Sequence, residues 1–187
     1  MDLALMRAPG HCGARLLLAA LVLSLALAPG PVRAEDLEAK LKSAFLLNFV
    51  RFIRFPAERY SSPDAPVDIC VLTPDPLAEA LEQSLAGKVV GGHPVRLRRG
   101  DRPEALRDCH LVFVGSRSSD LLDSQLARLA GFGVLSVHES GAPKSTGVIR
   151  LYSSDNYLRF EINQAAAERE RLEPSAGLLE IATRIRL

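Results

Sequence analysis

The sequence predicts an α/β fold: a single three-layer domain with a mainly parallel sheet, helices on both of its faces, a late β-hairpin and C-terminal helices. The main observation is that short β-branched runs alternate with amphipathic segments between residues 67 and 137, a pattern typical of parallel βαβ units. Two strand-like runs then follow each other without a helix between them, as in a hairpin. The 187 residues, 48% hydrophobic and 24% charged, have the size and composition of one folded domain.

The first 34 residues have the organisation of a secretory signal peptide. Arg7 and Arg15 supply positive charge around the start of an apolar run, Leu16–Ala28, which is shorter than the roughly 20 residues of a spanning helix. The small residues that a signal peptidase requires follow and end at Ala34. We therefore expect cleavage after Ala34 and an exported domain over residues 35–187. An uncleaved N-terminal anchor is the alternative.

The charge balance excludes one class of partner. The formal net charge is +1, with 23 Lys plus Arg against 22 Asp plus Glu. The signal segment carries four charged residues: Asp2, Arg7, Arg15 and Arg33. The exported domain is therefore also nearly neutral and has no strong positive field for nucleic acid. A short basic cluster remains in the middle of the chain: Arg96, Arg98, Arg99 and Arg102. We interpret this cluster as a solvated strand face; an acidic patch on a partner is the alternative.

The cysteines predict a disulfide. Cys12 leaves with the signal, so Cys70 and Cys109 remain as an even pair. In an oxidising compartment such a pair is expected to form a disulfide. The chain-entropy model gives a loop of this length about 4 kcal/mol of stabilisation. Metal ligation and a redox pair are the alternatives, but both normally use closer spacing than these two cysteines have.

The exported domain opens with an amphipathic helix, which we expect over residues 35–55 and which Pro56 ends. Large apolar residues recur along it at helical spacing: Leu37, Leu41, Phe45, Phe49 and Phe52. A stripe of this kind predicts the face that packs on the core. A dimer seam is the alternative for the same stripe.

Four strands are predicted in the alternating part: Val67–Leu72, Pro94–Arg98, His110–Val114 and Gly133–Val137. The segments between them predict helices that begin near Pro76, cover Pro103–Arg107 and end at Leu129. A flavodoxin-like strand order of 2-1-3-4 would make the first and third strands neighbours, about 4.8 Å apart. That order brings Cys70 and Cys109 within the range of a disulfide.

The pattern changes after the fourth strand. Val148–Tyr152 and Tyr157–Ile162 alternate as two strands joined by Ser153–Asn156, which predicts the late hairpin. Two helices are expected after it, Gln164–Leu172 and Leu178–Ile185, with a break at Pro174.

A ligand crevice is one candidate site. Polar residues follow the predicted parallel strands: Thr73, Ser116, Arg117, Ser118, His138 and Glu139. Ligands of open α/β sheets bind at this edge, and a helix N-terminus after Ser118 would favour an anion. The alternative is that the serines only cap that helix.

The sequence contains no motif of a known catalytic class. G-x-S-x-G, H-E-x-x-H, P-loop and G-x-G-x-x-G patterns are absent, and no histidine has a partner at the spacing of a helical zinc site. We therefore expect a protein that is not an enzyme and that uses no cofactor or metal.

Several segments together resemble one known family. They are the helix Leu41–Phe52 before Phe55-Pro56, then Ile69–Leu72, Cys109–Gly115, Leu135–Val137, and Arg159–Asn163 followed by Ser175 and Leu178-Leu179. In this order and spacing they resemble the YfiR-like family of periplasmic proteins across nearly the whole exported domain. The chain has Phe55 where the family often has tryptophan, and Thr146-Gly147 where it often has two glycines.

The resemblance implies a periplasmic regulator without enzyme activity. Such a protein binds the periplasmic part of an inner-membrane diguanylate cyclase and represses it, which controls cyclic-di-GMP signalling and biofilm formation. An outer-membrane lipoprotein with a peptidoglycan-binding domain is implied as a second partner. Members tend to be homodimers with a disulfide at the positions of Cys70 and Cys109. Their partner surface matches Phe160, Glu161 and Asn163.

A second hypothesis comes from the residues themselves and belongs to a different class. In that hypothesis the protein is an exported small-ligand sensor that serves a sensor kinase or a transporter. It would bind its ligand in the crevice around Ser116 and Arg117.

Overall fold

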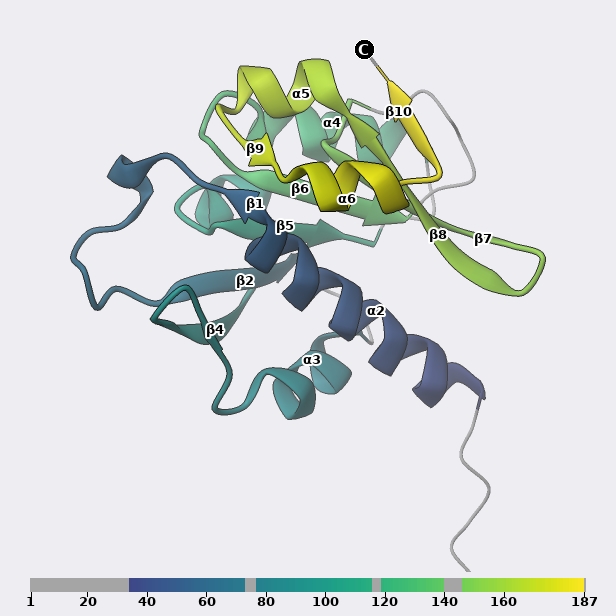
Figure 1. The fold of residues 1–187 in the computed structure, drawn as a ribbon, viewed down its shortest axis with the longest axis horizontal. Helices are drawn as coiled ribbons and strands as arrows, with labels where there is room; N and C mark the ends of the chain where they lie inside the picture. Colours follow the sequence, from purple (N-terminus) through teal and green to yellow (C-terminus); the bar gives the residue numbers. More distant parts are fainter. Residues whose placement is uncertain (1–33, 73–76, 116–118, 140–145, 187) are drawn as a thin grey trace, which may run out of the picture. The chain divides into compact units, whose positions relative to one another are not determined.

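Short strands and helices alternate to build an eight-stranded sheet in the computed structural model, which describes residues 34–72, 77–115, 119–139 and 146–186 (Figure 1). Four parallel strands lie side by side at its centre: β4 (His93–Gly100), β2 (Val67–Leu72), β5 (Leu111–Val114) and β6 (Leu135–Glu139). In chain order these are the second, first, third and fourth strands, so the predicted order is confirmed. β2 and β5 are buried throughout, as strands of a sheet covered on both faces are.

The late hairpin extends this sheet. β7 (Ile149–Ser154) runs parallel to β6, and β8 (Tyr157–Asn163) pairs antiparallel with β7 as predicted. Asp155 and Asn156 connect them with φ of 53° and 63°, the left-handed values of a two-residue hairpin turn. β6 pairs with β7 only as far as Leu151. The outer half of the hairpin is therefore a two-stranded ribbon that projects beyond its neighbours (Figure 1).

Helices cover the two faces of the sheet. Within the described ranges the α-helices are α2 (Ala34–Phe52), α3 (Leu77–Leu85), α4 (Ser119–Leu129), α5 (Gln164–Arg169) and α6 (Ala176–Ile181). Side chains of α2, α3, α5 and α6 share the larger hydrophobic core, and α4 contributes to a smaller one.

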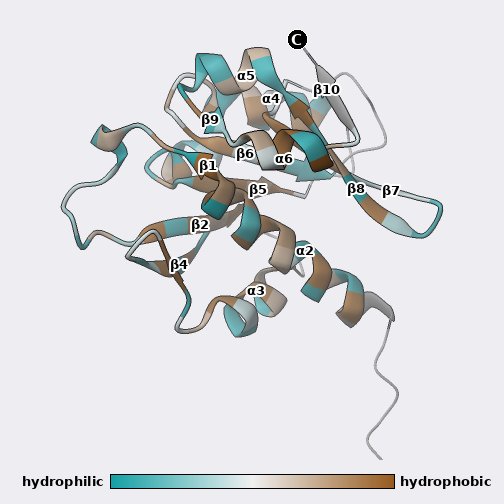
Figure 2. Cartoon of the chain, in the orientation of Figure 1, coloured by the Kyte–Doolittle hydropathy of each residue, from teal (hydrophilic) through white to brown (hydrophobic). Residues whose placement is uncertain are grey.

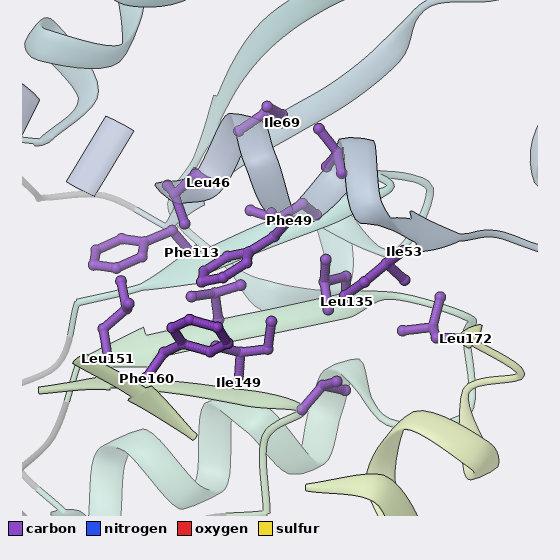
Figure 3. Packing of buried hydrophobic residues seen from close by; sticks show 14 of the residues in the cluster. Leu46, Phe49, Ile53, Ile69, Phe113, Leu135, Ile149, Leu151, Phe160 and Leu172 are labelled. Carbon is purple, nitrogen blue, oxygen red and sulfur yellow. The ribbon is translucent and has the colours of Figure 1, made fainter. Parts of the chain in front are cut away.

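The strand β2 separates these two cores because its successive side chains point to opposite faces. Ile69 and Val71 join the larger core, whose centre is shown in Figure 3. Cys70 and Leu72 join the smaller core. The layers are thus helix, sheet and helix, as predicted.

Cys70 forms a disulfide with Cys109, which directly precedes the strand β5; their Cα atoms are 6.2 Å apart and both side chains are fully buried. The predicted disulfide is therefore present.

Short elements complete the fold. They are the strands β1 (Ile53–Arg54), β3 (Val89–Val90), β9 (Glu173–Pro174) and β10 (Arg184–Arg186), and the 3-10 helices η1 (Ala57–Arg59) and η2 (Pro103–Leu106). β1 and β9 form a separate two-stranded sheet, whereas β3 and β10 are the edge strands of the large one. The helix predicted near Pro103 is therefore a 3-10 helix.

The first helix ends earlier than predicted. α2 stops at Phe52 and not at residue 55, because the next two residues leave the helix and pair with β9. The backbone N–H of Ser175 donates to the carbonyl of Phe52 at 2.9 Å, which satisfies one of the last helical carbonyls. Pairing with a segment more than 100 residues away is not visible in the local pattern that placed the helix end at Pro56.

The predicted core stripe of this helix is wrong for most of its residues. Leu37 is 65% exposed, Leu41 45% and Phe52 46%, whereas Phe49 is buried. The buried face instead carries four other side chains: Ser43, Leu46, Val50 and, in β1, Ile53. Apolar and polar residues are mixed around α2 along its length (Figure 2). Periodicity alone therefore could not select the face that packs on the sheet.

The C-terminal helices are also shorter than predicted. α5 ends at Arg169, and Arg171 takes a φ of 55°, which a helix cannot continue through. α6 ends at Ile181 instead of continuing through residue 185. The chain then pairs as β10 with the outer edge of β8, whose backbone groups would otherwise lack partners on that side. The fourth predicted strand is likewise shifted, because Gly133 turns with a φ of 68° and β6 begins two residues later.

Candidate partner-binding site

The predicted ligand crevice lies mostly outside the described residues. This is true of Thr73, Ser116, Arg117 and Ser118, so a ligand there stays a prediction. The other two residues of that edge are described. His138 is fully buried in β6. Glu139 accepts a hydrogen bond of 2.6 Å from Nζ of Lys42, which ties α2 to the end of β6.

The predicted partner-binding residues all lie on β8 and hold the hairpin in place. Phe160 is 3% exposed, and its ring centroid lies 5.1 Å from that of Phe49 in an edge-to-face contact (Figure 3). Asn163 caps α5, since its Oδ1 accepts a hydrogen bond of 3.1 Å from the N–H of Ala166. A direct role of these residues in partner binding stays a prediction.

Glu161, the third predicted residue, forms a buried ion pair with Arg150 of β7. The Arg150 Nε–Glu161 Oε2 distance is 3.1 Å and the Nη2–Oε1 distance is 3.0 Å. The Arg150 guanidinium also lies over the Tyr152 ring, 4.3 Å from its centroid. A buried and paired carboxylate offers little of itself to an incoming protein, so any contact surface of this hairpin would lie on exposed neighbours.

Such a surface lies directly over Phe160. An open groove of about 380 Å³ is lined by residues of α2, β8, the end of α6 and the segment after it: Phe45, Tyr157, Leu158, Arg159, Phe160, Ile181 and Thr183. Tyr157 is 68% exposed and Ile181 is 67% exposed. The N–H of Thr183 donates to the carbonyl of Phe160 at 3.0 Å, which fixes the segment after α6 against β8. Of the three predicted residues, Phe160 lines this groove, whereas Glu161 and Asn163 do not.

The described lining of the groove contains one charged residue. Of the lining residues that the structure describes, only Arg159 is an acidic or basic residue. Nη2 of Arg159 lies 4.0 Å from Oδ2 of Asp155 in the hairpin turn, and the guanidinium lies 5.9 Å from the Tyr157 ring centroid. Its Nε is buried and forms no hydrogen bond within the described part of the chain. Arg159 belongs to a segment that resembles the family, but the sequence assigned it no role.

A second and more polar pocket lies near the C-terminal end of α2. It has a volume of about 470 Å³, and Arg51, Arg54, Tyr60 and His93 are among its lining residues. Nη1 of Arg54 pairs with Oε2 of Glu173 at 2.8 Å. The rings of Tyr60 and His93 stack with their centroids 4.4 Å apart, and burial raises the pKa of the Tyr60 hydroxyl.

His110 lies next to this pocket and is kept neutral. It is 3% exposed, and its ring centroid lies 4.9 Å from that of Tyr60. Its Nδ1 accepts a hydrogen bond of 3.1 Å from the backbone N–H of Asp68. Burial, together with the positive charge of Arg59, lowers the pKa of His110 to about 4. The neutral ring acts as a hydrogen-bond acceptor that holds the strand β2.

The arginines of the basic cluster that lie on β4 are not simply solvated, because they form ion pairs with acidic residues of the same chain. Arg96 donates to both carboxylate oxygens of Asp68, at 2.7 Å and 2.8 Å. Arg98 donates to Asp108 at 2.7 Å. These partners belong to the same chain, so most of the positive charge is neutralised without an external acidic patch.

Neither a metal-binding cluster nor a membrane-spanning helix is found in the described residues. No group of three or more His, Cys, Asp or Glu side chains is arranged to hold a metal ion in the ranges that the structure covers. No helix in those ranges is long and apolar enough to cross a membrane.

Comparison with known proteins assigns the chain to a family. The crystal structure of a conserved domain protein from Vibrio cholerae O1 biovar El Tor is similar to it, with a TM-score of 0.55 and 10% sequence identity. The similarity covers 79% of this chain but only 60% of that protein, and at this identity it shows the fold alone. Comparison with curated proteins gave no match. The family profile described as YfiR/HmsC-like matches residues 39–183. Since that match spans most of the chain, this protein belongs to the YfiR/HmsC-like family, as the sequence resemblance predicted.

Proposed function

We propose that this protein represses an inner-membrane diguanylate cyclase by binding the cyclase's periplasmic part through the groove over Phe160. Family membership supports a periplasmic regulator of diguanylate cyclase signalling at the level of the family. The observation that carries the proposal for this chain is the apolar groove itself, with Tyr157 and Ile181 exposed on its rim. Exposed large apolar side chains that gather around a concavity are typical of protein–protein contact sites.

The proposal includes export and cleavage after Ala34, which would release the domain into the periplasm. There it could reach the cyclase and, as a second partner, an outer-membrane peptidoglycan-binding lipoprotein. The buried disulfide suits an oxidising compartment. No enzyme activity and no cofactor are part of this function.

We also propose that the protein is a homodimer and that α2 supplies part of the contact. Leu37 and Leu41 are one turn apart on this helix and are 65% and 45% exposed, which favours the dimer-seam alternative for the stripe. The variant Leu41→Asp should shift the protein to the monomer in light scattering at micromolar concentration. An unchanged mass would remove α2 from the dimer contact.

A binding experiment tests the main proposal. The periplasmic domain of the cyclase is immobilised, and the exported protein is titrated against it as wild type, as Ile181→Asp and as Leu121→Asp. Leu121 lies on α4 and is 53% exposed, so it is a matched apolar control away from the groove. We expect Ile181→Asp to weaken binding by about tenfold or more, because a charge would replace an apolar contact in the interface. The control should bind like the wild type. Absence of wild-type binding contradicts the proposal.

The small-ligand sensor remains the second candidate. It rests on the crevice residues Thr73, Ser116, Arg117 and Ser118, and the polar pocket beside Tyr60 offers an additional cavity. A screen of small anions by thermal unfolding would favour it if one of them raised the midpoint and Arg117→Ala removed the effect.

A further inference from the structure

We propose that the groove recognises a segment of the cyclase that presents an apolar side chain beside a carboxylate, and that Arg159 is the residue that pairs with this carboxylate. The inference rests on the proposed function and specifies the chemistry of the contact. It starts from the difference between two arginines of the same hairpin.

Arg150 and Arg159 lie on β7 and β8 but differ in how their charge is satisfied. Arg150 makes two contacts with Glu161, at 3.1 Å and 3.0 Å, in a buried setting. The contact of Arg159 with Asp155 is 4.0 Å, at the outer limit of an ion pair, and the side chain of Asp155 is 82% exposed. Exposed pairs at such a distance contribute little to stability. The guanidinium of Arg159 is therefore only weakly neutralised by the residues that the structure describes.

One hydrogen-bond donor of Arg159 is also unused within the described ranges. A guanidinium has five N–H donors in a planar fork. Nε of Arg159 is removed from water, yet it forms no hydrogen bond within the described ranges. A buried polar donor that stays unpaired destabilises the free protein. The side chain of Arg159 is 39% exposed, so a carboxylate on a bound segment would accept hydrogen bonds from the accessible N–H groups of its guanidinium.

The apolar walls of the groove favour an ion pair between Arg159 and a carboxylate of the bound segment. Phe45, Leu158, Phe160 and Ile181 line it together with Arg159, and no acidic side chain is among its described lining residues. A segment that covers the groove excludes water from the guanidinium, which strengthens the attraction to an anion. The apolar walls in turn require an apolar side chain on the same segment. A volume of about 380 Å³ holds a few side chains, so the recognised unit is a short segment.

A second copy of this chain is the competing occupant. Its α2 presents Leu37 beside Glu38, and both are exposed, so it carries the same combination of an apolar side chain and a carboxylate. The cyclase segment is favoured because the charge of Glu38 is already engaged: its Oε1 lies 2.8 Å from Nζ of Lys42. The experiment must separate the two occupants.

Binding of the exported full protein to the cyclase's periplasmic domain is measured for Arg159→Glu, Arg159→Gln and Arg159→Lys at low and high salt. The matched control is Arg102→Glu, because Arg102 is an exposed arginine whose nearest acid, Asp101, is also distant, at 3.8 Å. We expect Arg159→Gln to weaken binding by about tenfold or more and Arg159→Glu to weaken it further. Arg159→Lys should retain part of the affinity. The wild type should lose affinity with salt more steeply than Arg159→Gln does.

A charge-exchange experiment identifies the partner carboxylate. Exposed Asp and Glu residues of the periplasmic domain are changed one at a time to Lys. One of these variants should lose binding to the wild type and regain it with Arg159→Glu. Circular dichroism and unfolding midpoints check that each variant is folded.

The possible results separate the inference from the function on which it rests. If the wild type binds and Arg159→Glu binds equally well with the same salt dependence, the role of Arg159 is wrong and the proposed function stands. If Arg159→Glu keeps cyclase binding but dissociates a homodimer, the occupant is a second copy and the inference is overturned. If the wild type does not bind the domain, the proposed function fails and the inference fails with it.

Discussion

Arg150 and Glu161 face each other across the hairpin β7–β8, directly opposite in register, and form a two-contact ion pair whose side chains are 8% and 4% exposed. The pair lies beside Phe160, the floor of the groove, so the hairpin that carries the proposed contact surface depends on it. Removing one member leaves the other charge buried, which is costly.

We predict that Glu161→Ala lowers the free energy of unfolding by about 3–5 kcal/mol, the usual cost of breaking a buried ion pair. The double variant Arg150→Met/Glu161→Leu should lose clearly less, because no uncompensated charge remains. Urea unfolding measures both. A loss below about 1 kcal/mol for the single variant would show that the pair does not hold the hairpin. The result also matters for function, because repression lost in a Glu161 variant can reflect unfolding of the hairpin.

The stability of the protein should fall in acid because of His110. Its pKa is about 4 in the folded protein, below the ordinary value of 6.5 that applies to the unfolded chain. Between these two values the unfolded chain binds more protons, so the free energy of unfolding decreases as the pH falls from 6.5 to 4. The full loss is about 3 kcal/mol. Urea unfolding across this range measures it.

His110→Asn is the control for this pH dependence. Asparagine can still accept the hydrogen bond from the N–H of Asp68 but does not titrate in this range. The variant should therefore show a flatter dependence of stability on pH between 6.5 and 4. An unchanged slope would assign the acid sensitivity to other groups.

The disulfide should contribute strongly to stability. Cys70 and Cys109 are 39 residues apart, and closure of such a loop is worth about 4 kcal/mol in the chain-entropy model. We predict that Cys70→Ser and reduction of the wild type each lower the unfolding midpoint. Reductant should have no effect on the midpoint of Cys70→Ser. Equal midpoints for the wild type with and without reductant would contradict the prediction.

Two glycines should respond in opposite directions to the same substitution. Gly133 has a φ of 68°, and an added Cβ would lie 3.3 Å from Cδ of Arg59, whose guanidinium donates to the carbonyl of Phe132 at 2.9 Å. Gly133→Ala should therefore destabilise the protein by about 1–3 kcal/mol. Gly177 lies within α6, and a Cβ there would meet nothing within 4 Å. Gly177→Ala should be neutral or stabilising by up to about 1 kcal/mol. Thermal unfolding compares the two, and equal effects would be inconsistent with the packing around Arg59.

The sequence predicted the centre of the fold because its signals are local. β2 and β5 are short, near-continuous apolar runs, which is the sequence pattern of parallel strands that are buried on both faces. The hairpin was predictable for the same reason, since Asp155 and Asn156 suit the left-handed turn between two alternating runs. The disulfide was predicted from the even pair of cysteines in an exported domain, and the strand order agreed with it.

The groove could not be predicted, because its parts come together only in the folded chain. Phe45, Phe160 and Ile181 come from α2, β8 and α6, and no local pattern connects them. The face of α2 was misassigned for a related reason: it has apolar residues on more than one side, and only contact with the sheet selects Leu46 and Val50 over Leu37 and Leu41. Tertiary packing, and not the local sequence pattern, likewise determines which apolar side chains stay exposed on the rim of the groove.

The most direct test of the proposed function is the level of cyclic-di-GMP in cells that express the cyclase with this protein as wild type, Ile181→Asp or Leu121→Asp. The proposal predicts low cyclic-di-GMP with the wild type and with Leu121→Asp, and a rise toward the level of a deletion strain with Ile181→Asp. Equal abundance of the three proteins in the periplasmic fraction is the control. Cyclic-di-GMP that is unchanged by deletion of the protein would contradict the account.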